Sequence, residues 1–325
     1  MNNKKHRIGI IVFISIIVLS VIFAVLNTTM LFSVIKQGTD SPGSILNITK
    51  YKKNGYVAAL YINGVIEKAN MTYNQQWLLS TISDLKYDKS NKGIALFIDS
   101  PGGGVYESDE TYLALQDYKT TGKPVYVYQG VLAASGGYYI SCAGNKIYAN
   151  RNTLTGSIGI IMGTSVDLTE LMKKVGIKSE TITSGRNKNM FNYNQPVTDE
   201  QRDIMRSIAD EAYEQFTGIV AMNRNIPVFE VKKLADGRIY TAKQALHLNL
   251  VDAIGTWDGM LKDMADECFD GHIYDTKDFE YNHKMSLRDY IINGVFGGDS
   301  AAARKADRLF SEAAMHYPAF LYNGN

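Results

Sequence analysis

A long apolar run marks the start of the chain. No charged residue lies between Arg7 and Lys36, and the first twenty residues of this run are almost purely apolar. About 20 apolar residues span the hydrocarbon core of a bilayer as a helix. A cleavable signal peptide would have a shorter apolar region of ~7–15 residues and a small-residue cleavage site, and residues 26–33 offer no convincing site. The pattern therefore favours an uncleaved membrane anchor within residues 1–36.

Charge predicts the orientation of this anchor. Lys4, Lys5 and Arg7 precede the run, and no acidic residue occurs before Asp40. The positive-inside rule then places the N-terminus in the cytoplasm and the rest of the chain outside. Residues 37–55 are polar and contain Gly, Pro and Ser, which indicates a stalk. We expect a single-pass protein of the cell membrane with an extracytoplasmic domain.

From Tyr56 onward, short apolar runs alternate with helical patterns. This alternation predicts an α/β domain over residues 56–284, followed by a C-terminal extension over 285–325. Glycine-rich turns lie at strand-to-helix junctions, where open α/β sheets usually place ligands. The predicted strands are 57–62, 93–99, 124–130, 146–150, 157–162 and 178–185. The predicted helices are 106–119, 134–144, 168–176, 198–223, 228–235, 241–248 and 257–268.

Composition and charge argue against several classes of function. The chain has 325 residues, 45% of them apolar and 21% charged, which are ordinary globular values. The net charge of +1 argues against a nucleic-acid partner, which needs a clustered basic surface. Residues 1–36 hold four basic residues and no acid, so the remainder carries 30 basic against 33 acidic residues, or −3. Cys142 and Cys268 are too few for a disulfide framework or a zinc ribbon, and whether they pair or stay as buried free thiols is open.

A first candidate site is the glycine turn at 99–105, which directly follows a predicted buried strand. Three successive glycines let backbone N–H groups approach a ligand closely. Neither the Walker A nor the dinucleotide-binding spacing is met, since Val105-Tyr106 and Ser108 stand where those motifs need other residues. An oxyanion hole is the remaining functional interpretation, and a plain tight turn is the alternative.

A second candidate is Ser135, which lies between small residues at a strand-to-helix junction. The first glycine of the hydrolase elbow pattern is replaced by Ala133. A helix that begins here would place unpaired N–H groups beside the Ser135 hydroxyl. On this pattern alone, a helix N-cap is the simpler interpretation.

A serine nucleophile needs a base, and the five histidines offer little support for a triad. His6 precedes the anchor, and the others lie far along the chain from both glycine turns, at His247, His272, His283 and His316. Lysine is the other base that pairs with serine, and burial helps to keep it neutral. Lys188 lies in the segment 183–193 and is followed by apolar side chains. From spacing alone, a solvated loop lysine is the favoured interpretation.

Taken together, these motifs resemble the signal peptide peptidase A (protease IV) family in its short, single-pass bacterial form. The resemblance covers roughly residues 56–265 and rests on motifs that occur in one order: INGVI (62–66), IDSPGGGV (98–105), AASGGYYIS (133–141), TGSIGI (155–160), the SGRNKN segment with its lysine, ADGRIYTAKQAL (235–246) and NLVDAIG (249–255).

The resemblance implies a ClpP/crotonase-like fold with a Ser-Lys dyad and no cofactor or metal. Matched by position, Ser135 is the nucleophile, Lys188 the general base and Ser157 the hydroxyl that orients the lysine amine. The backbone N–H groups of Gly102 and Gly103 match the oxyanion hole. One departure is Arg186, a fixed charge close to a base that must be neutral, and we expect its side chain to point to solvent.

The resemblance also implies an assembly and a substrate. Members of the family form membrane-facing rings or domes, an octamer being one candidate size, with sites built across subunits. Their substrates are apolar signal peptides left in the membrane. The implied function is a membrane-anchored serine endopeptidase that degrades such peptides on the extracytoplasmic side. The alternatives are a non-catalytic scaffold or peptide-binding oligomer on the same fold, and acyl-thioester chemistry.

The C-terminal extension gives one further expectation. Residues 318–323, PAFLYN, are apolar enough to occupy a peptide groove. The segment is therefore a candidate for self-inhibition or self-processing, and a flexible tail is the alternative.

Overall fold

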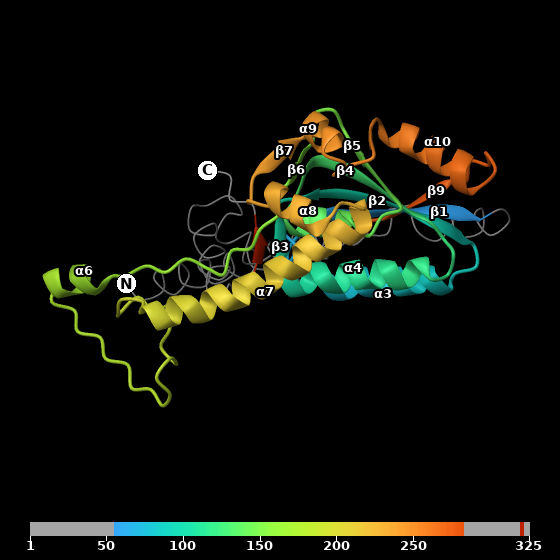
Figure 1. The fold of residues 1–325 in the computed structure, drawn as a ribbon. Coiled ribbons are helices and arrows are strands. Elements are labelled where there is room, and N and C mark those ends of the chain that lie inside the picture. Colours follow the sequence, from blue (N-terminus) through green and yellow to red (C-terminus); the bar gives the residue numbers. More distant parts are fainter. Residues whose placement is uncertain (1–54, 283–318, 322–325) are drawn as a thin grey trace, which may run out of the picture. The chain divides into compact units, whose positions relative to one another are not determined.

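The computed structural model describes residues 55–282 and the strand at 319–321 (Figure 1). The expected anchor, the stalk and most of the C-terminal extension lie outside the described residues. Within the described part of the chain, no helix combines the length and the apolar character needed to cross a membrane.

Eight strands of the described residues form one sheet, in the order β7-β6-β4-β2-β1-β9, with β5 paired to β4 and β8 paired to β5. Neighbouring strands are parallel except for the β6–β7 pair. The predicted α/β class is therefore confirmed. The strands are β1 (Tyr56–Asn63), β2 (Asn91–Ser100), β4 (Val125–Ala134), β5 (Lys146–Ala149), β6 (Leu154–Gly156), β7 (Ile239–Thr241), β8 (Ala253–Ile254) and β9 (Thr276–Phe279).

The two halves of strand β4 pair with different strands. Tyr126–Gln129 pair with β5, whereas Leu132–Ala134 pair with β6. At the division, the Thr153 hydroxyl donates to the carbonyl groups of Gln129 (3.0 Å) and Gly130 (2.6 Å). The last residues of β4 thus leave β5 and pair with β6 in the same sheet, and they lead directly to Ser135.

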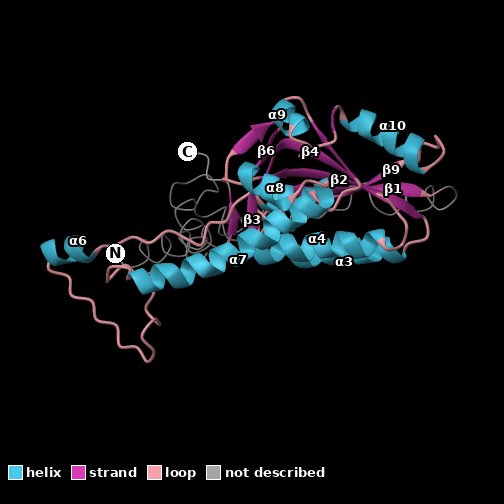
Figure 2. Ribbon diagram, viewed as in Figure 1, coloured by secondary structure: helices cyan, strands magenta, loops and turns pink. Residues whose placement is uncertain are grey.

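Helices cover both faces of the sheet (Figures 1 and 2). One face packs against α10 through Met260 and Met264, which contact side chains such as Val57 and Tyr128. Helices α3 and α4 lie on the opposite face. The helices are α3 (Gln75–Tyr87), α4 (Val105–Lys119), α5 (Gly136–Ser141), α6 (Thr169–Lys174), α7 (Asp199–Arg224), α8 (Val228–Leu234), α9 (Ala242–His247) and α10 (Trp257–Cys268).

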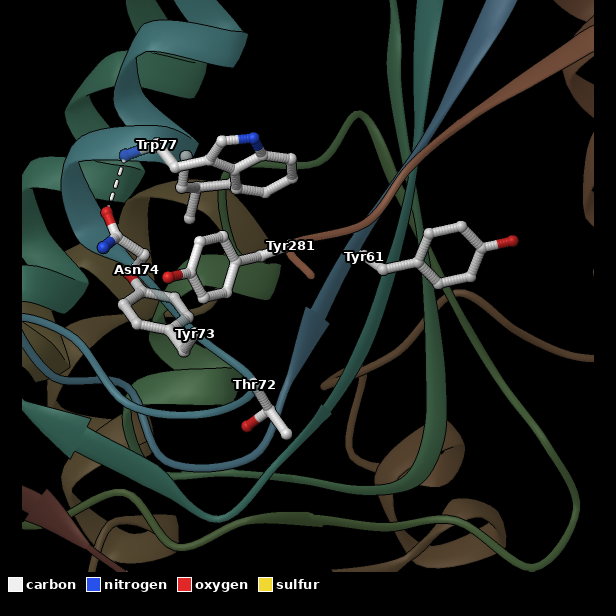
Figure 3. Close-up of a pocket in the computed structure, with 7 residues that line it drawn as sticks. Tyr61, Thr72, Tyr73, Asn74, Trp77 and Tyr281 are labelled. Carbon is white, nitrogen blue, oxygen red and sulfur yellow. Dashed lines mark hydrogen bonds between the residues drawn. The ribbon is translucent and has the colours of Figure 1, made fainter. Parts of the chain in front are cut away.

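Helix α3 is an element for which the sequence analysis made no prediction. The Asn74 side chain caps it by accepting from the Trp77 N–H at 2.9 Å (Figure 3). Leu78, Ile82 and Leu85 are buried at the i, i+4, i+7 spacing of one helix face. This cap and this spacing are the signals that could have identified the helix.

Two predicted strands are wrong. The strand predicted at 157–162 is β6 instead, and it ends at Gly156 because Gly156 (φ 89°) and Ser157 (φ 51°) successively adopt left-handed angles that leave the ladder. Residues 178–185 form an exposed loop, in which the Ile182 side chain is 92% exposed. Among the described strands, none pairs with this loop.

The cysteines do not form a disulfide. Cys142 is buried and Cys268 is exposed, and both are free thiols. Of the two alternatives left open by the sequence, free thiols are therefore correct, and burial holds for Cys142 but not for Cys268.

Candidate active site

Ser135 lies at the sharp turn between β4 and α5. Its backbone angles are φ 54° and ψ −116°, a combination that side chains strongly disfavour. Its N–H donates to the Gly156 carbonyl at 2.8 Å, and its carbonyl accepts from the Tyr139 N–H at 2.9 Å. The hydroxyl is fully buried and has no hydrogen-bond partner among the described residues. A strained turn thus holds a buried hydroxyl oxygen that has no hydrogen-bond partner among the described residues.

The turn depends on the two glycines that follow Ser135. A Cβ atom on Gly136 would lie 2.4 Å from Ser108 Oγ and 3.2 Å from the Gly103 nitrogen. A Cβ atom on Gly137 would lie 3.1 Å from the Ser100 carbonyl oxygen. Both contacts are tighter than ordinary van der Waals contact, so the missing side chains bring the start of α5 against the glycine turn.

The predicted glycine turn forms a short strand, β3 (Gly102–Gly104). The Ile66 N–H donates to the Gly102 carbonyl at 2.9 Å, and the Gly104 N–H donates to the Ile66 carbonyl at 2.8 Å. Because the peptide groups of a strand alternate in direction, the N–H and carbonyl of Gly103 face the opposite edge.

The two predicted oxyanion donors differ in their availability. The Gly102 N–H already donates to Ser100 Oγ at 3.0 Å. The Gly103 N–H faces the other edge of β3, close to Gly136, and residues 319–321 of the chain lie along that edge. Gly136 is the first residue of α5, where backbone N–H groups have no partner within the helix. These contacts favour Gly103 and Gly136, rather than Gly102 and Gly103, as the candidate pair of N–H donors for Ser135.

A segment of the C-terminal extension lies along this second edge of β3. Strand β10 (Ala319–Leu321) pairs with β3 in antiparallel orientation, with Ala319 opposite Gly104, Phe320 opposite Gly103 and Leu321 opposite Gly102. The edge that carries the Gly103 N–H can therefore accept an extended peptide.

Ser157 follows the β6 strand as Ser135 follows β4. Ala134 and Gly156 are partners in the β4–β6 pair, so the two serines come next on adjacent strands. Ser157 is 6% exposed and has φ 51°, and its N–H donates to the Arg238 carbonyl at 2.9 Å. The structure thus brings Ser157 to the same end of the sheet as Ser135.

Lys188 is not brought to Ser135 within this chain. It is an exposed residue of the loop between α6 and α7, which in Figure 1 extends away from the sheet. The neighbouring Arg186 is 79% exposed and forms an ion pair with Glu200 at 2.6 Å. This arrangement agrees with the expectation that Arg186 points to solvent.

The other ionisable groups of α5 are poor substitutes for the lysine. Burial raises the pKa of Cys142 to about 12 and raises the pKa of the Tyr138 and Tyr139 hydroxyls. Tyr139 donates to Asp109 at 2.6 Å and accepts from Gln215 at 2.7 Å. All three groups are protonated at neutral pH and cannot act as a base for Ser135.

Two hollows lie near the loop that precedes α3. The first, shown in Figure 3, is lined by aromatic residues including Tyr73, Trp77 and Tyr281 and has no room for a water molecule. The second is a groove of about 750 Å³, lined in part by Lys68, Gln76 and Glu107. Over the described part of the chain, no cluster of three or more His, Cys, Asp or Glu side chains is arranged to hold a metal ion.

Comparison with known proteins identifies the family of this chain. Residues 117–268 match the model of peptidase family S49. A protein of Enterococcus faecium named as a signal peptide peptidase SppA is 32% identical over 95% of this chain and 94% of its own length. Protease 4 of Salmonella typhi is 31% identical over 65% of this chain but only 34% of its own length.

A solved structure was found by its similar shape. A point mutant of ClpP1 from Listeria monocytogenes aligns with 66% of this chain and 99% of its own at 18% identity and a TM-score of 0.43. The family match agrees with the ClpP/crotonase-like fold that the sequence motifs imply. Because the Enterococcus faecium relative matches over nearly its whole length, the chain belongs to peptidase family S49.

Proposed function

We propose that this chain is a membrane-anchored serine endopeptidase that degrades remnant signal peptides on the extracytoplasmic side of the membrane. The observation that carries the proposal is the Ser135 hydroxyl, which is buried, unpaired among the described residues and held on a strained turn. Ser135 precedes Gly136, which packs closely against Gly103 of β3, and β10 pairs with this same strand.

The chemistry follows from these groups. Neutral Lys188 takes the proton of Ser135 Oγ, and the oxygen attacks a peptide carbonyl. The N–H groups of Gly103 and Gly136 stabilise the resulting oxyanion, and one such donor is worth about 10²–10³ in rate. The lysine ammonium then protonates the leaving amine, and water hydrolyses the acyl-enzyme. Ser157 orients the lysine amine.

A neighbouring subunit supplies the lysine in this proposal. Lys188 is exposed on its loop, whereas a lysine base must be desolvated to become neutral. The same part of the chain exposes several large apolar side chains, namely those of Val166, Leu171, Val175, Ile177 and Ile182. A second copy that covers this surface would bury the loop and carry Lys188 to the Ser135 of the next subunit. A closed ring or dome repeats this contact.

The substrate class follows from the strand edge. A peptide that adds to β3 is bound through its backbone, so it must be extended. Apolar signal peptides meet this requirement. The pairing of β10 with β3 supports the use of this edge, and it also makes the C-terminal segment a competitor for it.

The second candidate is a non-catalytic scaffold that uses the same groove for binding. It is favoured by the separation of Lys188 from Ser135 within one chain. A serine-reactive acylating probe and an apolar peptide test the two candidates on the purified full chain. The peptidase is expected to be labelled at Ser135 and to lose peptide cleavage in both Ser135→Ala and Lys188→Met. Full cleavage by both variants would contradict the proposal, and binding without labelling or cleavage would favour the scaffold.

A further inference from the structure

The carboxylate of Glu107 lies directly against the strand that receives the peptide. A Cβ atom built on Gly104 would be 1.9 Å from Glu107 Oε2, so the carboxylate occupies the space that a side chain at position 104 would need. The Glu107 carbonyl accepts from Gln75 Nε2 at 3.2 Å and from the Thr111 hydroxyl at 2.9 Å. These bonds fix the backbone from which the carboxylate extends.

Helix capping does not account for this carboxylate. Glu107 is the third residue of α4, where a capping carboxylate would accept from the N–H of the N-cap residue, Gly104. The Gly104 N–H donates to the Ile66 carbonyl instead. Within residues 55–282, the Glu107 carboxylate makes no ion pair or side-chain hydrogen bond.

The register of β3 directs one peptide side chain toward Glu107. Gly103 faces the peptide with its N–H and carbonyl, so the next pair, at Gly104, is of the close, non-hydrogen-bonded kind. Side chains of directly opposed residues in an antiparallel pair point to the same face. A peptide residue opposite Gly104 therefore projects to the face on which the Glu107 carboxylate lies.

The groove that Glu107 helps to line provides the room for a long side chain. Its volume is about 750 Å³, and its lining includes polar groups from Asn74, Gln76 and Tyr106 in addition to Glu107. Lys68 is the other charged residue of this lining, and it forms no ion pair with Glu107. Of these two charged side chains, it is Glu107 whose carboxylate lies against Gly104, so the charge nearest the position opposite Gly104 is negative.

We propose that Glu107 is a specificity-determining residue that selects lysine or arginine at the peptide position opposite Gly104. The inference rests on the proposed function, in which a substrate takes the place of β10. In this register, the peptide carbonyl that accepts from the Gly103 N–H belongs to the residue that follows the one opposite Gly104. The cleaved bond comes after that following residue, one position beyond the basic side chain. A signal peptide offers this order where its basic n-region meets its apolar stretch.

The test compares three peptides that carry Lys, Met or Glu at the second residue before the cleaved bond and are otherwise identical. We expect the wild-type full chain to cleave the Lys peptide with a kcat/KM about fivefold above that of the Met peptide, and the Glu peptide to be the slowest. Glu107→Gln should bring the three rates together. Glu110→Gln, on the same helix but outside the groove lining, should retain the wild-type ratio. An unchanged ratio in Glu107→Gln would overturn the inference.

A binding measurement separates this inference from the proposed function. The same peptides, carrying a fluorophore, are titrated into full-length Ser135→Ala, which needs no catalysis. A Kd that favours Lys, together with an uncleaved peptide in the wild type, would refute the peptidase but keep the role of Glu107. Equal Kd values and equal cleavage rates would refute the role of Glu107 alone. If the peptides are neither bound nor cleaved, both the peptidase function and the role of Glu107 are refuted.

Discussion

At the scale of single residues, two serines hold backbone angles that side chains rarely adopt. Ser135 has φ 54° and Ser157 has φ 51°, and such angles each cost about 1–3 kcal/mol unless the surroundings enforce them. The enforcement here is a pair of hydrogen bonds, from Ser135 N–H to Gly156 and from Ser157 N–H to Arg238. Strain of this kind concentrates at functional sites, which agrees with the proposed role of both serines.

Gly136→Ala tests the approach of α5 to the glycine turn. The added methyl group would meet Ser108 Oγ at 2.4 Å and the Gly103 nitrogen at 3.2 Å, so it should displace the oxyanion donors. We expect a loss of about 10²-fold in kcat, with a decrease of about 1–3 kcal/mol in the free energy of unfolding. Peptide cleavage and urea unfolding of the purified protein measure the two effects.

Gly218→Ala is the matched control, because a Cβ atom there meets nothing within 4 Å inside α7. This variant should keep its activity and gain about 0.5–1 kcal/mol in stability from the better helix former. Equal activity in the two variants would contradict the proposed oxyanion hole.

The sequence indicated Ser135, Ser157 and Gly103 by motif, but it did not distinguish the available N–H groups. The hydrogen bond from the Gly102 N–H to Ser100 Oγ depends on the conformation of the turn, which spacing does not reveal. Gly136 was missed as a donor, although its place directly after a candidate nucleophile at a helix start was a usable signal.

At the scale of elements, β3 is a short strand with a different neighbour on each of its two edges. One edge is closed by the backbone of Ile66, and the other receives β10. An unpaired strand edge is a template for a further strand. The C-terminal segment and a substrate would therefore compete for the same backbone groups.

Removal of the chain after residue 317 tests this competition. We expect the truncated protein to cleave an apolar peptide several-fold faster at low substrate concentration, because β10 no longer occupies the edge of β3. The control is a chain of full length in which Asn323 and Asn325, outside β10, are replaced by Ser. An unchanged rate after truncation, together with an intact C-terminus in mass spectrometry of the wild type, would remove the self-inhibitory role.

Most elements follow from local pattern, and the exceptions have physical causes. The core strands are continuous apolar runs, and β2 and β4 were predicted within a few residues of their ends. The loop at 178–185 has a strand-like composition, but it has no pairing partner in the described part of the chain. Pairing is a non-local property, so composition alone could not exclude a strand there.

At the scale of the whole molecule, the segment between β6 and α7 exposes large apolar side chains. Ile182 is 92% exposed, and other large apolar side chains of this segment are also exposed. Exposed apolar surface is typical of an interaction site when it is extensive. In the proposed assembly, this segment forms the contact between subunits.

Ile182→Asp tests this assignment. The introduced charge would be buried in the contact, so we expect a smaller particle in light scattering and a loss of activity of more than about tenfold. Ile273→Asp is the control, because Ile273 is also exposed at 68% but lies after α10. Wild-type particle mass and activity for Ile182→Asp would show that the loop does not form the contact.

In the proposed mechanism, Ser135 of one subunit works with Lys188 of another. Subunits with Ser135→Ala and subunits with Lys188→Met are co-expressed with different tags, and assemblies that contain both are purified. Each variant alone should be inactive, and random mixing should restore about a quarter of the wild-type sites, since a working site needs an intact serine beside an intact lysine from the other subunit. Mixed assemblies that bind peptide but show no cleavage would contradict the claim.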